Sequence, residues 1–209
     1  MTTEPWIFPV GHYGGPFFPD VEQPLRYHHV RVGVSSQKLW DEAEFRVWAL
    51  AHGLPDREGT EPWTRRDVEA EAANDGVADS ATTVDGLLTR GLLVEVSPGT
   101  EQTLEFARTY RIEPLLVGLG NSSDDLLGYR VGMAGYAPLV VLERTASELW
   151  QFGQSCDNLW TACELFARVA REIGETDPAH TDPLVLLDRA IPALRTLISH
   201  SASYLDTAD

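Results

Sequence analysis

The sequence is poor in lysine and in positive charge altogether. Lys38 is the only lysine among 16 basic residues, which stand against 32 acidic ones and leave a formal net charge of −16. A chain this acidic repels phosphate backbones at long range, whereas nucleic-acid-binding proteins usually carry a basic stripe. The charge therefore disfavours nonspecific DNA binding. It suits either a basic partner or simple solubility.

Cysteines and long apolar runs are scarce as well. Cys156 and Cys163 stand seven positions apart in one predicted helix and its approach, so a disulfide between them is geometrically implausible. No apolar run approaches the roughly 18–20 residues that span a bilayer. The first residues lack the basic region and apolar stretch of a secretory signal. We therefore expect a cytoplasmic protein without membrane contact.

Motifs for catalysis, cofactors and metals are also missing. The segment Gly118-Leu-Gly-Asn begins like a dinucleotide fingerprint but lacks the third glycine, and the chain has neither a Walker loop nor a Gly-x-Ser-x-Gly elbow. His28 and His29 are adjacent on a predicted strand, so they point to opposite faces and cannot easily ligate one ion. We predict no catalytic residue, no metal and no cofactor. A small enzyme of unassigned chemistry ranks last among the functions considered.

What the sequence does contain is a recurring order of predicted elements. The alternation of Val30, Val32 and Val34 with polar or small residues indicates a half-buried strand. Helices are predicted at 41–52, 64–74 and 80–90. The segment Thr64-Arg-Arg-Asp67 has the form of a capping box, and Gly91 is a C-terminal cap before a strand at 92–96. This order resembles a winged helix.

A similar order follows residue 128. Strands are predicted at 129–133 and 138–142, and helices at 145–152, 158–173 and 183–198. The first of these helices opens with a second capping-box pattern, Thr145-Ala-Ser-Glu148. Trp48 and Trp150 occupy equivalent places in the two halves, which indicates an internal structural repeat. Between the halves we expect one short helix at 100–109 and then an irregular connection.

The predicted architecture is mostly α with small β elements, an α+β fold. It consists of an aromatic, Gly- and Pro-rich arm at 1–27, a winged-helix-like module at 28–98, a helical linker at 99–127 and a second winged-helix-like module at 128–209. Large aromatic side chains are costly to leave in water, so the arm is expected to lie across the body or across a partner.

Winged helices also serve as protein-interaction modules. In the related recognition domains of peptide-modifying systems, a peptide adds a strand to the edge of the sheet. The resemblance therefore implies a non-catalytic adaptor or regulatory factor that binds a protein or peptide, with edges at 30–34 and 129–133. A homodimer is compatible with the sequence. The residues predicted to contact the partner are Trp6, Tyr13, Phe17, Phe18 and Arg31.

The alternative is a sequence-specific DNA-binding transcription regulator of the winged-helix type. In that interpretation the helix at 80–90 enters the major groove. Its exposed positions are short of the Arg, Asn or Gln side chains that usually read base edges. The candidate DNA contacts are Arg65, Arg66, Thr82, Thr83 and Arg90.

Overall fold

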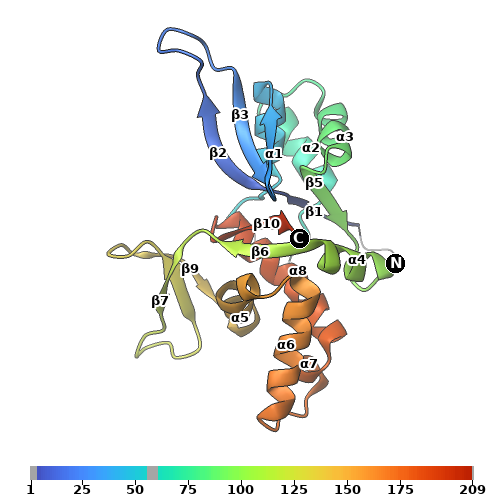
Figure 1. Cartoon of the computed structure of the whole chain (residues 1–209), viewed down its shortest axis with the longest axis vertical. Coiled ribbons are helices and arrows are strands. Elements are labelled where there is room, and N and C mark those ends of the chain that lie inside the picture. Colours follow the sequence, from blue (N-terminus) through green and yellow to red (C-terminus); the bar gives the residue numbers. More distant parts are fainter. Residues whose placement is uncertain (1–3, 56–60, 209) are drawn as a thin grey trace.

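The computed structural model describes residues 4–55 and 61–208 and shows an α+β protein (Figure 1). Its described strands form two sheets of two strands and two sheets of three strands, and all of their pairings are antiparallel. No helix in the described ranges is both long and apolar enough to cross a membrane.

The first half runs from an opening strand, through a three-stranded meander and three helices, to a closing strand that pairs with the opening one. We call residues 6–96 the first repeat. Its elements are β1 (Trp6–Pro9), β2 (His12–Phe17), β3 (Tyr27–Val32), β4 (Ser35–Leu39), α1 (Glu42–Leu50), α2 (Arg65–Asn74), α3 (Ser80–Thr89) and β5 (Leu93–Val96).

The second half follows the same order after α4 (Glu101–Thr109), and we call residues 110–207 the second repeat. Two short helices are added: the 3-10 helix η1 (Gly153–Ser155) after α5, and α7 (Pro178–Thr181) before the last long helix. The other elements are β6 (Tyr110–Pro114), β7 (Val117–Gly120), β8 (Tyr129–Gly132), β9 (Pro138–Leu142), α5 (Arg144–Phe152), α6 (Leu159–Glu172), α8 (Pro183–Ser199) and β10 (Ser203–Thr207).

Matching hydrogen bonds close the two repeats in the same register. The backbone N–H of Val10 donates to the carbonyl of Leu92 at 2.9 Å, and that of Leu115 donates to the carbonyl of Ala202 at 2.9 Å. Each bond joins the residue after the opening strand to the residue before the closing strand. These two bonds therefore give a residue-by-residue alignment of β1 with β6 and of β5 with β10.

The end of the third long helix also recurs. Gly91 after α3 has φ 67°, and Ser201 after α8 has φ 52°. Both N–H groups bond back to the helix at 3.0 Å, to Leu88 and Ile198 respectively. This left-handed turn suits glycine because it has no Cβ. Ser201 is the only non-glycine residue with positive φ in the described part of the chain.

Both meanders share a further irregularity and a tryptophan. The register of β2 shifts before Gly15, and that of β7 shifts before Gly120; both glycines have positive φ. The helices that follow the meanders, α1 and α5, are nine residues long, and Trp48 and Trp150 occupy the seventh position in each. The two tryptophans are thus equivalent, as the sequence predicted.

Two apolar cores fill the repeats, and β1 joins them. Successive residues of a strand point to opposite faces. Ile7 accordingly packs in the core of the first repeat, whereas Trp6 and Phe8 pack in the core of the second. The ring of Phe8 lies 6.0 Å from that of Phe106 on α4. The segment predicted as a separate arm therefore contributes a strand to the body of the protein.

Most of the predicted helices are confirmed within a residue or two, including the Thr64–Asp67 capping box. The second capping box is wrong. The N-cap of α5 is Glu143, whose carboxylate accepts from the N–H groups of Thr145 and Ala146, so the cap lies two residues before the predicted Thr145.

Two further expectations about strands are wrong. The segment predicted as an irregular connection contains β6 and β7. The strands proposed as open edges, at 30–34 and 129–133, correspond to β3 and β8, which are the middle strands of their sheets. Because a middle strand is paired on both sides, the open edges lie elsewhere.

Candidate functional site

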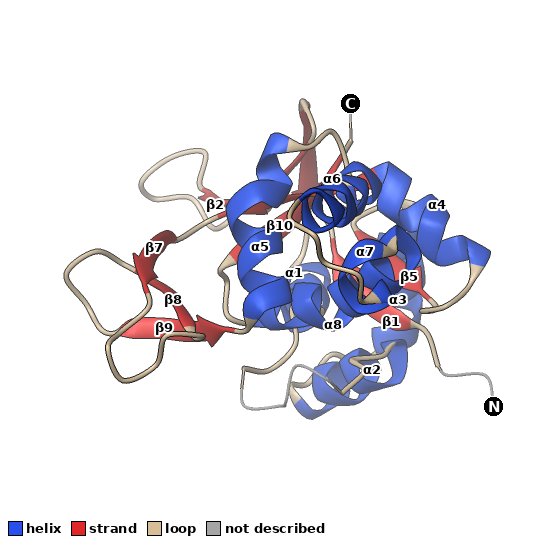
Figure 2. Ribbon diagram, turned by 90° about the horizontal axis from the view of Figure 1, so that it is seen from below, coloured by secondary structure: helices blue, strands red, loops and turns tan. Residues whose placement is uncertain are grey.

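The sheet of the second repeat carries an unusual amount of exposed apolar surface. Figure 2 shows β7, β8 and β9 projecting to one side of the helices. Eight exposed large apolar side chains lie on these strands and their connections. Exposed apolar side chains that gather in one region of a soluble protein often mark an interaction site. The residues are Leu115, Val117, Leu126, Leu127, Met133, Tyr136, Leu139 and Val141.

Strand β9 is the apolar edge of this sheet. Its sequence from 138 to 142 is PLVVL, and within the described chain its only ladder partner is β8. Leu139 and Val141 are 51% and 52% exposed. In an antiparallel pair, every second residue of an edge strand directs its N–H and C=O away from its neighbour. Natural edges are usually protected by charged residues, by proline, by bulges or by a covering element; β9 has no charged residue, and its only proline, Pro138, stands at its first position.

The corresponding edge of the first repeat is closed by side chains. Arg90, after α3, pairs with Glu44 at 2.7 Å and also donates to the backbone carbonyl of Lys38 in β4. The other oxygen of Glu44 accepts from the backbone N–H of Trp40 at 2.8 Å. We call Arg90 and Glu44 the edge clamp, because together they occupy an acceptor at Lys38 of β4 and the donor at Trp40, the residue after that strand.

The alignment of the repeats shows that the second sheet has no counterpart of this clamp. Glu44 is the third residue of α1, and the third residue of α5 is Ala146. Arg90 precedes Gly91, and its counterpart before Ser201 is His200. The ring of His200 bonds to the carbonyl of Thr196 in its own helix at 3.0 Å. Neither replacement bonds to β9 in the described structure.

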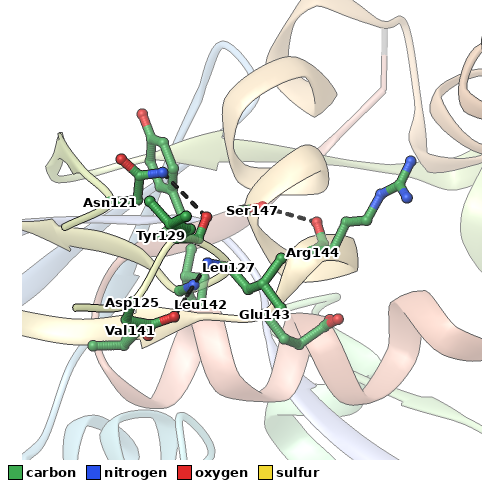
Figure 3. Close-up of a pocket in the computed structure, with 11 residues that line it drawn as sticks. Asn121, Asp125, Leu127, Tyr129, Val141, Leu142, Glu143, Arg144 and Ser147 are labelled. Atoms are coloured by element: carbon green, nitrogen blue, oxygen red, sulfur yellow. Dashed lines mark hydrogen bonds between the residues drawn. The ribbon is translucent and has the colours of Figure 1, made fainter. Parts of the chain in front are cut away.

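A cleft of about 800 Å³ opens beside the end of β9. The loop between β7 and β8 forms one wall, and β9 with the first turn of α5 forms the other (Figure 3). Leu126 and Leu127 lie on the loop and are highly exposed, Leu127 at 89%. The guanidinium of Arg144 points away from the loop residues in Figure 3 and pairs with Glu148 at 2.8 Å.

The carboxylates of the cleft are bound within the protein. Asp125 accepts from the backbone N–H of Gly128 at 2.8 Å and from that of Leu127 at 3.1 Å, which holds the loop closed. Glu143 caps α5. With its acids hydrogen-bonded within the chain, the cleft presents mainly the apolar side chains of Leu126, Leu127 and Val141.

The residues predicted to contact a partner fall in different environments. Trp6 is 6% exposed and belongs to the core, so it supports the fold. Tyr13 is half-exposed, and its hydroxyl lies 2.8 Å from His28 Nδ1. Phe17 and Phe18 are exposed on the β2–β3 hairpin, which projects from the body (Figure 1). Arg31 is bound within the chain: it donates to Asp206 at 2.9 Å and to Tyr204 at 2.6 Å.

The arginines of the DNA interpretation are largely neutralised within the chain. Arg65 pairs with Glu69 and, at 2.7 Å, with Asp85, and these carboxylates raise its pKa. Arg90 belongs to the edge clamp, whereas Arg66 is exposed. The hydroxyl of Thr83 donates to the carbonyl of Asp79, and Thr82 is exposed on α3. The charges of two of the three arginines are thus compensated by carboxylates of the same chain.

Nucleophilic and metal-binding groups do not gather at the cleft. The two thiols are free, and burial raises the pKa of Cys163 to about 12. The described residues contain no group of three or more His, Cys, Asp or Glu side chains arranged to hold a metal ion.

The sequence carried one signal of the β9 edge that our prediction did not use: five consecutive residues without charge, at 138–142. That run predicts a strand, but whether it lies at an edge depends on its pairing, which sequence patterning does not give. Comparison of the chain with models of protein families, with curated proteins and with solved structures finds no match.

Proposed function

We propose that this protein is a non-catalytic adaptor or regulatory factor that captures an extended segment of a protein or peptide by strand addition at β9. In this proposal each repeat is a winged-helix-like module whose three helices support a three-stranded sheet. Because the β4 edge of the first repeat is clamped, the proposal places the added strand on the sheet of the second repeat. The observation that carries the proposal is the apolar, unclamped edge of β9 beside the cleft.

The residues of the β9 edge indicate which kind of peptide sequence would bind there. Main-chain hydrogen bonds to β9 would supply affinity, and pockets for alternate side chains would supply specificity. Leu139 and Val141 flank the edge, and cross-strand neighbours of apolar residues are favourably apolar. The net charge of −16 attracts a basic segment at long range. We therefore propose a segment in which apolar residues alternate with polar or basic ones.

A designed peptide tests this proposal. The probe is a fluorescently labelled Lys-Val-Thr-Val-Lys-Leu-Thr-Val-Lys peptide, and the readout is fluorescence anisotropy. We expect saturable binding to the wild-type protein. We expect its loss in the double variant Leu139→Lys with Val141→Lys, because lysine protects natural strand edges. The matched control is Val169→Lys with Ile173→Lys, which places the same charges on an exposed position of α6 and on the exposed residue after its end.

Either of two results overturns the proposal: no saturable binding to the wild type, or equal binding to the β9 variant and the wild type. Two parallel measurements identify the competing functions. Duplex DNA binding with a steep salt dependence would favour the transcription regulator. A concentration-dependent dimer that the β9 variant abolishes would assign the edge to a second copy of the chain.

A further inference from the structure

A second cavity lies between the two repeats, apart from β9. It has a volume of about 410 Å³ and is lined by β2, α1, the residue after β6, the end of α8 and β10. Figure 1 shows α1, β2 and β10 converging near the centre of the molecule. Sites for small molecules commonly have volumes of about 300–1,000 Å³ and lie where structural units meet. Both conditions hold here.

The walls of this cavity are aromatic. Tyr13, Phe45 and Trp48 contribute rings from the first repeat, and the centroid of Tyr13 lies 5.3 Å from that of Phe45. On the second-repeat side, the ring of Tyr204 lies 5.0 Å from that of His12. Ring faces and edges arranged in this way pack favourably against another planar ring.

Most polar groups in the walls of the cavity already form hydrogen bonds within the protein. The indole N–H of Trp48 donates to the carbonyl of Val10 at 3.3 Å, and the hydroxyl of Tyr204 accepts from Arg31 at 2.6 Å. The described lining contains no Asp, Glu, Lys or Arg side chain. The cavity therefore favours an uncharged molecule, since nothing in its lining compensates a buried charge.

His52 adds one directed hydrogen-bonding group. Its Nδ1 lies 3.2 Å from the carbonyl oxygen of Trp48 and 3.1 Å from that of Ala49. Carbonyl oxygens only accept, so Nδ1 carries the proton and donates. Burial lowers the pKa of His52 to about 4, so the ring is neutral at pH 7. Nε2 then bears a lone pair, so a donor placed beside this lining residue can bond to it.

We infer that the cavity between the repeats binds a small, planar, uncharged aromatic molecule that carries an N–H donor for Nε2 of His52. This site differs in position and chemistry from the peptide site at β9. It does not depend on the proposed function, because the two sites share no lining residue.

Indole and 1-methylindole form a pair of probes with the same ring system, in which methylation replaces the N–H donor by an N–CH3 group. The readout is a ¹H–¹⁵N NMR titration of the full chain. For a ligand this small we expect an indole Kd of roughly 0.1–1 mM, with shifts centred on the cavity residues. We expect 1-methylindole to bind about three- to tenfold more weakly, because one hydrogen bond is lost.

Two variants locate the site. Ala49 lines the cavity, so Ala49→Leu should fill part of it and weaken both probes at least about tenfold. Ala81→Leu makes the same change on the exposed face of α3 and should leave binding unchanged. His52→Phe keeps a ring but removes the acceptor, so indole should lose its advantage over 1-methylindole.

The inference is overturned if indole shifts no cavity residue at 10 mM, about ten times the upper expected Kd. It is also overturned if Ala49→Leu binds indole as the wild type does. Equal affinities of the wild type for both probes would refute the role of His52. Should His52→Phe fail to fold, the comparison of the two probes on the wild type still tests that role.

Discussion

Exchanging the residues at the left-handed turns of the two repeats tests the alignment on which the site argument depends. Ser201 adopts φ 52° where the first repeat has Gly91 at φ 67°. A left-handed conformation costs an L-residue about 1–2 kcal/mol. Glycine costs about 0.4–1 kcal/mol through the greater entropy of the unfolded chain. The difference predicts that Ser201→Gly stabilises the protein by about 0.5–1 kcal/mol.

The reverse substitution, Gly91→Ser, should destabilise the protein by a similar amount. A Cβ built on Gly91 meets no atom within 4 Å, so backbone strain is the only cost expected. The free energy of unfolding is measured for both variants by urea titration, followed by circular dichroism. The reasoning is refuted if Ser201→Gly is neutral or destabilising while Gly91→Ser is tolerated. The double variant should return close to the wild type, because independent effects add.

Three other predictions concern charged and titratable groups. Arg90→Ala should lower the free energy of unfolding by about 2 kcal/mol, because a charged hydrogen bond and a half-buried ion pair are lost. The control Arg66→Ala, at an exposed position, should change the free energy of unfolding by less than about 0.5 kcal/mol in the same urea assay. His52 has a pKa near 4 when folded and 6.5 when unfolded, so its contribution to stability is complete above pH 6.5 and is lost as the pH falls towards 4. That loss amounts to at most about 3 kcal/mol, and His52→Gln should flatten the corresponding part of the pH profile. In a thiol-reagent assay Cys156 should react in the native protein and Cys163 only after unfolding, since burial raises the pKa of Cys163 to about 12; rapid native reaction of both thiols would contradict the packing of α6.

Local patterns predicted the helices well but not the sheets. The apolar spacing and the caps at Thr64 and Asn158 identify helix starts from neighbouring residues alone. The short strands β6 and β10 pair with each other, although nearly the whole second repeat separates them in the chain. Their sequences, YRIEP and SYLDT, show no clear alternation, so sequence analysis had no basis for pairing them.

The candidate site could not be predicted from the sequence for the same reason. Aromatic residues near residue 1 indicated a binding arm, yet Trp6 fills a core that is completed by α4 and the second repeat. Arg90 looked like a DNA contact because its partner, Glu44, lies 46 positions away in the chain. An edge strand and a paired arginine are properties of the tertiary structure. They become visible only once the strand pairing and the side-chain contacts are known.

The pairing of each repeat's first and last strands has a consequence for folding. Trp6 pairs with Val96, and Tyr110 pairs with Thr207, so each closure joins residues about 90–100 positions apart. Closing such long loops costs entropy before any contact compensates it, so closure should come late and slowly. During synthesis the first repeat can close before the second is complete. Trp6 and Phe8 would then stay exposed to water until the core of the second repeat forms. In that interval the nascent chain is most exposed to aggregation and most dependent on chaperones.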